Sequence, residues 1–238
     1  MKLSDDRELN LFPVKIRMLS GSVLKLIAIV AMLIDHTAVG FSVGAELALF
    51  SLGGSTVTLY MLLRYIGRIA FPLFVFLLVE GFVHTKSRKR YGMRLFLFAL
   101  ISEIPFNLFV GGSLLYAKQN VFFTLLLGYL ALCALEAYHK KWTVWLIPVL
   151  LVISFFLKAD YGYAGFVFIL LVYLLRKMPL VGAMMSACVL SVASAAAFLP
   201  IGLYNGKRGF IRMRSMGYLF YAFYPAHLLC IALIKFLI

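Results

Sequence analysis

The chain has 238 residues, of which 64% are hydrophobic and only 13% are charged. Soluble domains are about 45–50% apolar and about 25% charged, so this composition excludes a soluble globular protein and indicates a polytopic membrane protein. The formal net charge of +14 does not indicate a nucleic-acid partner, because the basic residues lie between apolar runs, where they set topology, and no polar segment interleaves them with stacking aromatic residues.

Eight apolar segments follow one another along the chain, and we interpret each as a membrane-embedded helix. They cover about residues 22–43, 62–83, 93–110, 120–138, 142–157, 162–176, 180–199 and 218–236. The fifth and sixth are short and could be tilted or partly re-entrant. The sequence therefore predicts an all-α membrane protein with about eight spans in one bundle, in which residues 1–21 form an uncleaved cytoplasmic segment and residues 22–238 form the membrane domain.

Basic residues predict which loops face the cytoplasm, because lysine and arginine are enriched on that side. The loop 84–94 is the strongest such signal, and together with the basic N-terminal segment it places the N-terminus in the cytoplasm and the protein in the cytoplasmic membrane. The supporting residues are Lys2, Arg7, Lys15, Arg17, Lys140, Lys141, Arg176 and Lys177. The basic loop 207–214 disagrees, since the eight-span count places it outside. Either a span is miscounted or this loop has a role beyond topology, and we favour the second explanation.

The first span contains Asp35 and His36 side by side in an otherwise apolar run. An ionisable residue at membrane depth costs about 3 kcal/mol or more, so a chain that keeps two there usually uses them. His36 is the more informative of the two, because an imidazole can accept and release a proton near neutral pH. Lys25 lies eleven residues earlier, which is about three helical turns, so both side chains lie on one helix face about 16 Å apart.

Asp35 lies about 100° around the helix from its neighbour His36 and cannot hydrogen-bond the imidazole across one face. We expect it to pair with a cation on another helix, and Arg64 and Arg68 are the candidates, since they are four residues apart and share a face of the second span.

The other intramembrane polar residues crowd at one level, toward the outer side. They are Arg64 and Arg68 at the outer start of the second span, Glu103 and Asn107 in the outer half of the third, Asp160 at the outer face after the fifth and His227 in the middle of the last, and the predicted topology puts Lys207 and Arg208 on the outer side. Lipid cannot satisfy such groups, so they must face one another or a wet cavity. They form either a purely structural network, with Arg68 bound to Glu103 or Asp160, or a functional site. No cysteine or histidine spacing indicates a metal site.

Seven segments resemble, in order, the characteristic blocks of the TraX family. They are LKLIAIVAMLIDHTAVGF, RYIGRIAFPLFVFLLVEGFVHT, RLFLFALISEIPFNL, NVFFTLLLGYLAL, ADYGYAGFVFILLVY, LYNGKRG and YLFYAFYPAHLL. The resemblance covers most of the chain from Leu24 to Leu229, and the DH and YPxHL elements are its most specific parts. The named member of that family is implicated in N-terminal acetylation of conjugative pilin, a substrate that belongs to one branch.

The wider resemblance is to membrane acyltransferases of the acyltransferase-3 type, whose first span carries a basic residue eleven positions before a histidine. Lys25 and His36 occupy these positions here, although that family uses Arg at the first one, and Lys cannot make the same forked contact. The resemblance implies transfer of an acyl group, in the first place acetyl, from acyl-CoA to a peptide, glycan or lipid-linked acceptor at the outer side of the membrane, with no metal.

In that interpretation His36 is the general base, and Asp35 or Glu103 sets its charge state. Arg64, Arg68 or Asn107 stabilises the oxyanion, and Asp160 and His227 complete the acceptor site. Lys25 and the loop 86–94 hold the CoA phosphates, in competition with Lys207 and Arg208. The alternative function is a secondary transporter or flippase that uses the same polar layer, although the sequence shows no pair of broken spans that would mark two inverted halves.

Overall fold

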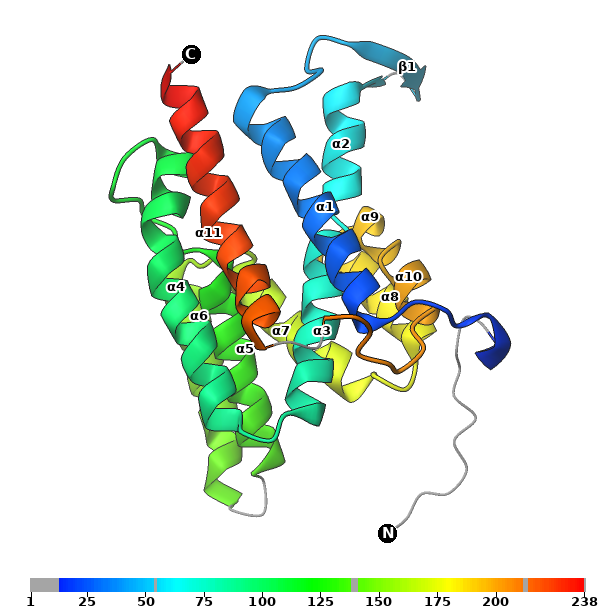
Figure 1. Ribbon diagram of the computed structural model, residues 1–238, viewed down its shortest axis with the longest axis vertical. Coiled ribbons are helices and arrows are strands. Elements are labelled where there is room, and N and C mark those ends of the chain that lie inside the picture. The colour runs from blue at the N-terminus through cyan, green and yellow to red at the C-terminus, as the bar shows by residue number, and fades with distance from the viewer. Residues whose placement is uncertain (1–12, 54, 138–140, 212–213, 238) are drawn as a thin grey trace.

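The structure is a computed structural model that describes residues 13–53, 55–137, 141–211 and 214–237. These ranges are mostly helical, and Figure 1 shows the long helices standing side by side. The predicted class of helical membrane protein is confirmed. Three of the basic residues used to predict orientation, Lys2, Arg7 and Lys140, lie outside the described residues, as does Arg212 of the disagreeing loop 207–214.

The long helices are those with enough apolar length to cross a bilayer. They are α1 (Gly21–Phe41), α2 (Leu59–Gly67) continuing into α3 (Ala70–His84), α4 (Arg88–Gly111) and α11 (Arg214–Leu237). By length and composition, four such stretches occur among the described residues, when α2 and α3 are taken together. They coincide with the first, second, third and eighth predicted spans. A short hairpin of antiparallel strands, β1 (Ala48–Leu52) and β2 (Ser55–Thr58), joins α1 to α2.

Three shorter helices, α5 (Val121–Glu136), α6 (Leu146–Leu157) and α7 (Gly162–Leu174), occupy only part of the height of the bundle. Asn120, the N-cap of α5, donates a hydrogen bond to the carbonyl oxygen of Ala99, which lies halfway along α4. The amide of Asp160, in the turn between α6 and α7, donates to the carbonyl oxygen of Gln119 at 2.8 Å. Asp160 therefore lies about halfway up the bundle, deeper than the outer face where the sequence placed it.

The predicted seventh span, 180–199, is not one helix. It forms α8 (Pro179–Val189), α9 (Val192–Ala195) and α10 (Phe198–Gly202), and the backbone at Ser191 is extended. Ser191 caps the restarted helix by accepting from the amide of Ser194, whose hydroxyl in turn accepts from the amide of Ser191. The segment enters the bundle, turns and returns, so it does not cross.

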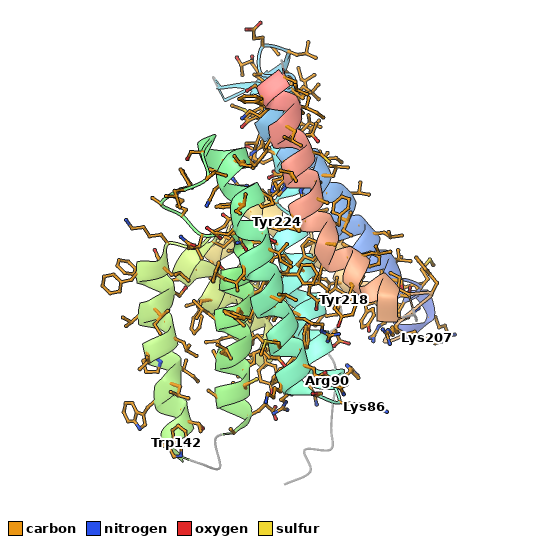
Figure 2. All side chains as sticks on the ribbon, turned by 60° about the vertical axis from the view of Figure 1, so that its left-hand side comes forward. Lys86, Arg90, Trp142, Lys207, Tyr218 and Tyr224 are labelled. Atoms are coloured by element: carbon orange, nitrogen blue, oxygen red, sulfur yellow. The ribbon has the colours of Figure 1, made fainter. Side chains whose placement is uncertain are left out.

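This return corrects the predicted position of the loop 207–214. The first amides of α1 lack helical acceptors, and the carbonyl oxygens of Lys207 and Arg208 accept from the amides of Gly21 and Ser22 at 2.8 and 2.9 Å. Figure 2 shows Lys207 at the same end of the molecule as Lys86, Arg90 and Trp142. The prediction that Lys207 and Arg208 lie on the opposite side from the start of α1 is therefore wrong, because the seventh segment does not cross.

Candidate functional site

Two histidines from opposite ends of the chain meet between α1 and α11. Nδ1 of His36 lies 2.6 Å from Nε2 of His227, and the two rings are nearly parallel, with an interplanar angle of 10° and centroids 4.9 Å apart. His227 is buried and His36 is partly buried. The pair is surrounded by aromatic rings, of which Phe109 and Tyr224 have centroids 5.3 and 6.2 Å from the His36 ring. The sequence placed His36 in the outer half of the first span and His227 in the middle of the last, but it did not pair them.

The hydrogen bonds of this pair assign the tautomer of each ring. Nδ1 of His227 lies 2.7 Å from the carbonyl oxygen of Phe223, and a carbonyl only accepts, so His227 donates from Nδ1. Nε2 of the neutral His227 ring is then an acceptor, and it must receive the proton on Nδ1 of His36. Nε2 of His36 is left with a free lone pair. Residue 227 therefore orients residue 36 in the way that an acceptor orients a catalytic imidazole in other enzymes.

Asp35 forms the expected ion pair with a cation from another helix. Nη1 of Arg64 donates to Oδ2 of Asp35 at 2.6 Å, and both side chains are mostly shielded. The prediction that Asp35 pairs with Arg64 or Arg68 is confirmed for Arg64. A Cβ added at Gly67 would overlap the Asp35 carboxylate, so the missing side chain at Gly67 lets α2 approach α1 at this point. The hydrogen-bond partner of His36 is His227 rather than Asp35 or Glu103.

Glu103 and Asn107, both on α4, make hydrogen bonds to nearby segments and not to the histidine pair. The Glu103 carboxylate accepts from Nδ2 of Asn120 at 2.6 Å, and Nδ2 of Asn107 donates to the carbonyl oxygen of Leu114 at 2.9 Å. The Oδ1 atom of Asn107 is buried and makes no hydrogen bond to the described residues. Glu103 therefore ties the start of α5 to α4. Among the described residues it forms no ion pair with Arg68, which was one of the two pairs offered for a purely structural network.

The cations proposed for CoA gather at one end of α1. Lys25 lies within electrostatic range of Arg208, and its Nζ atom is 5.7 Å from the centroid of the Phe220 ring. Because the loop of Lys207 and Arg208 packs on the start of α1, the two predicted cation groups lie at the same end of the bundle as Arg90. His36 lies on the same helix, about 16 Å further along its axis.

Two residues to which the sequence analysis assigned no role complete the site. Gly67 allows the close approach at Asp35, and Tyr224 lies edge-on to both histidine rings. Tyr224 could have been found, since it precedes His227 by three positions and so shares its helix face. Within the described ranges, no group of three or more metal-ligating side chains is close enough to hold an ion.

Comparison with known proteins identifies relatives over nearly the whole chain. A family model described as "TraX protein" matches residues 20–235. The chain is also 35% identical over 245 aligned residues to a protein of Dichelobacter nodosus named "Probable fimbrial assembly protein FimC, serogroup H1", in an alignment that covers 88% of this chain and 93% of that protein. No solved structure matches the chain. The resemblance to TraX is confirmed, and the resemblance to acyltransferase-3 enzymes stays a prediction.

Proposed function

This chain belongs to the TraX family, and from that premise we propose that it is a membrane-embedded acyltransferase that moves an acyl group, in the simplest case acetyl, from acyl-CoA to an amine or hydroxyl. The observation that carries the proposal is the free lone pair on Nε2 of His36. A neutral imidazole with an assigned tautomer, oriented through Nδ1 by His227 and surrounded by aromatic rings, has the features of a general base.

The reaction requires one proton transfer in each direction. Nε2 of His36 takes the proton of the acceptor amine or hydroxyl as its nitrogen or oxygen attacks the thioester carbonyl carbon. The tetrahedral intermediate then collapses, the carbon–sulfur bond breaks, and the departing CoA sulfur receives the proton from Nε2 of His36. The products are the acylated acceptor and free CoA, and the histidine returns to its starting state.

Arg64 supports this reaction by stabilising the oxyanion. It lies within electrostatic range of His36 and donates one hydrogen bond to Asp35. A guanidinium has five N–H donors, so Arg64 keeps donors for an oxyanion while Asp35 fixes its position. In a water-poor site such a donor contributes about 3 kcal/mol to the transition state.

The donor enters from the cytoplasm in this proposal. The basic loops, including 84–94 and Lys207–Arg208, lie at the same end of the bundle as the start of α1, which by the positive-inside rule is the cytoplasmic end. Because Lys207 and Arg208 also lie at this end, their positive charge no longer conflicts with the positive-inside rule, as it did in the eight-span prediction. Lys25 and Arg208 are then placed to bind the phosphates of CoA, while the thin pantetheine arm reaches toward His36.

We propose that the molecule that receives the acyl group is a component that is assembled into a pilus. The relative from Dichelobacter nodosus carries a name that refers to fimbrial assembly, and the TraX resemblance implies acetylation of a pilin. A peptide, a glycan or a lipid-linked precursor each offers an amine or hydroxyl that His36 could deprotonate from the outer side of the membrane.

Transport is the second candidate function. The break in the seventh segment at Leu190–Ser191 and the break between α2 and α3 at Arg68–Ile69 both occur inside the bundle. Interrupted helices at this depth are typical of transporter binding sites. A transporter or flippase would move its substrate unchanged, whereas a transferase leaves the acyl group on the acceptor.

A doubly labelled donor separates the two functions. Inverted membrane vesicles, with and without the chain, are incubated with acetyl-CoA that carries ¹⁴C in the acetyl group and ³H in the adenine. The transferase predicts chain-dependent ¹⁴C, without ³H, in acid-stable membrane or protein products. Uptake of both labels in a constant ratio supports transport, and no chain-dependent change in either label contradicts acyl transfer from acetyl-CoA.

A further inference from the structure

Three interruptions of helices meet around one cavity that is partly open to the surface of the bundle. They are the break between α2 and α3 at Arg68, the turn between α6 and α7 at Tyr161, and the break between α8 and α9 at Leu190–Ser191. The cavity has a volume of about 200 Å³ and is lined by Arg68, Tyr161, Ala164, Val189, Leu190, Ser191 and Ser194. Irregular backbone at membrane depth persists where it lines a cavity or a binding site, so the convergence of three such segments marks this place. We refer to it as the Arg68 cavity.

The backbone amide of Arg68 donates to the carbonyl oxygen of Arg64, but its guanidinium makes no hydrogen bond or ion pair to any residue that the structure describes. It lies within electrostatic range of Asp35 and Asp160, but Asp35 is already paired with Arg64. Asp160 accepts from the amide of Tyr161 and is not within ion-pair distance of Arg68. The Arg68 side chain is exposed where the cavity opens, so its guanidinium keeps N–H donors for a ligand.

The hydroxyls at the tip of the α8–α9 turn do not bind the Arg68 guanidinium. The Ser194 hydroxyl bonds to the Ser186 hydroxyl at 2.9 Å and to the carbonyl oxygens of Ser186 and Ser191, and the Ser191 hydroxyl accepts from the Ser194 amide. The turn satisfies its own polar groups. It therefore forms a rigid wall of the cavity and leaves Arg68 as the charged group that lines it.

The third wall of the cavity is strained. The backbone of Tyr161 has φ 64° and that of Lys158 has φ 51°. Both lie in the left-handed region, which residues other than glycine rarely adopt. The Tyr161 ring is held by stacking on Phe71, with centroids 3.7 Å apart and an interplanar angle of 7°. Backbone strain of this kind clusters at ligand sites, where packing over-determines the conformation.

We propose that the Arg68 cavity binds an anionic group, a carboxylate or a phosphate, through the fork of the Arg68 guanidinium. The volume lies below the range of drug-sized ligands, so the cavity holds one small group and not a nucleotide. The proposal concerns recognition of a ligand and does not depend on acyl transfer. The group belongs either to a free solute anion or to a membrane-bound molecule, such as a phospholipid or a lipid-linked phosphate, that reaches the cavity with its head group.

The test measures binding of defined anions to the purified full chain in a non-ionic detergent. Thermal unfolding midpoints are recorded in inorganic phosphate, in acetate and in chloride at constant ionic strength, and in mixed micelles that contain phosphatidic acid or phosphatidylcholine. A ligand that binds only the folded state raises the midpoint in proportion to the logarithm of its concentration. Apparent affinities are compared for the wild-type chain and for Arg68→Gln, Arg68→Lys, Ala164→Leu and Lys235→Gln.

The proposal predicts that an anion raises the midpoint of the wild type and of Lys235→Gln, which removes an exposed cation near the end of α11, away from the cavity. Arg68→Gln should weaken the apparent affinity at least about tenfold, as expected for loss of a charge-assisted contact. Arg68→Lys should show an intermediate loss, because lysine lacks the fork. Ala164→Leu keeps the charge but fills the cavity, so it should also weaken binding, and it serves as the test if Arg68→Gln does not fold.

The arms of the test identify the source of the anion. An Arg68-dependent shift with phosphate or acetate indicates a solute anion, and an Arg68-dependent shift with phosphatidic acid alone indicates a membrane-bound phosphate. Equal shifts in the wild type, Arg68→Gln and Ala164→Leu, or no shift with any anion, would overturn the proposal. Since no acyl transfer is measured, these outcomes are independent of the proposed enzymatic function.

Discussion

His36 and His227 are 191 positions apart in the chain, yet Nδ1 of His36 and Nε2 of His227 are 2.6 Å apart. The chain of contacts runs from the carbonyl oxygen of Phe223 through both rings and ends at Nε2 of His36. Because the carbonyl oxygen of Phe223 can only accept, it determines which nitrogen donates and which accepts in both histidine rings. The two histidines therefore have different roles, since one orients and the other is available for proton transfer.

His227 is expected to act as a positioning residue. His227→Ala removes the acceptor for Nδ1 of His36 and should lower the rate of acyl transfer at least about tenfold. His227→Gln should retain more activity, because the amide oxygen can accept the same hydrogen bond. The chain has four histidines, so ¹⁵N NMR of histidine-labelled protein can follow the tautomer directly. A His36 ring that remains protonated at Nδ1 in His227→Ala, with unchanged activity, would contradict this role.

Gly67 is expected to be required for the packing of α1 against α2. Gly67→Ala would place a Cβ on the Asp35 carboxylate and should destabilise the protein by roughly 1–3 kcal/mol, the usual effect of overpacking. The matched control is Gly217→Ala, since a Cβ at this helical position meets no atom within 4 Å, and alanine there should be neutral or stabilising by up to about 1 kcal/mol. Thermal unfolding in detergent compares the two, and equal stabilities would refute the packing argument.

The corrected topology predicts which sites share a side of the membrane. In a variant without Cys133, Cys188 and Cys230, single cysteines at Lys207 and Lys86 should react with a membrane-impermeant maleimide from the same side. A cysteine at Leu115, which is exposed in the loop after α4, should react from the other side. If Lys207 labels together with Leu115, the seventh segment crosses the membrane after all and the re-entrant turn is wrong.

Much of this fold could be predicted from the sequence, because a long apolar run has few stable alternatives in a bilayer. The seventh segment was misread because 180–199 is mostly apolar and carries no charge, and this composition is compatible with a segment that crosses and with one that turns. Neither glycine nor proline marks the break at Leu190–Ser191. The local signal is the pair Ser191 and Ser194, which have the spacing of a capping box but which also read as small packing residues.

The sequence identified individual residues of the candidate site better than it predicted which of them are in contact. Asp35 and Arg64 could be paired from sequence, because an acid in a membrane helix requires a cation. His36 and His227 could not, since each lies on its own helix and no spacing rule relates helices so far apart in the chain. The depth of Asp160 also depended on packing, because α5, α6 and α7 are shorter than the bundle.

Lys25 is expected to bind the donor and to leave the chemical step unchanged. Lys25→Ala should weaken binding of acyl-CoA roughly tenfold, as for loss of a charge-assisted contact, while the rate at saturating donor changes little. Lys25→Arg should be tolerated, and Lys235→Ala, near the opposite end of the bundle on α11, is the matched control. Donor Kd is measured on correctly inserted protein, and an unchanged value for Lys25→Ala removes this residue from the donor site.

The central claim is that Nε2 of His36 is the general base of an acyl transfer. Its most direct test is the single-turnover rate of acetyl transfer at saturating acetyl-CoA for the wild type, His36→Ala and His84→Ala, all reconstituted in the same lipid. The account predicts that His36→Ala purifies normally and loses about 10²–10⁴-fold in rate, while His84→Ala, which removes an exposed histidine bonded only to Glu80 among the described residues, retains the wild-type rate. Transfer by His36→Ala at the wild-type rate would contradict the claim.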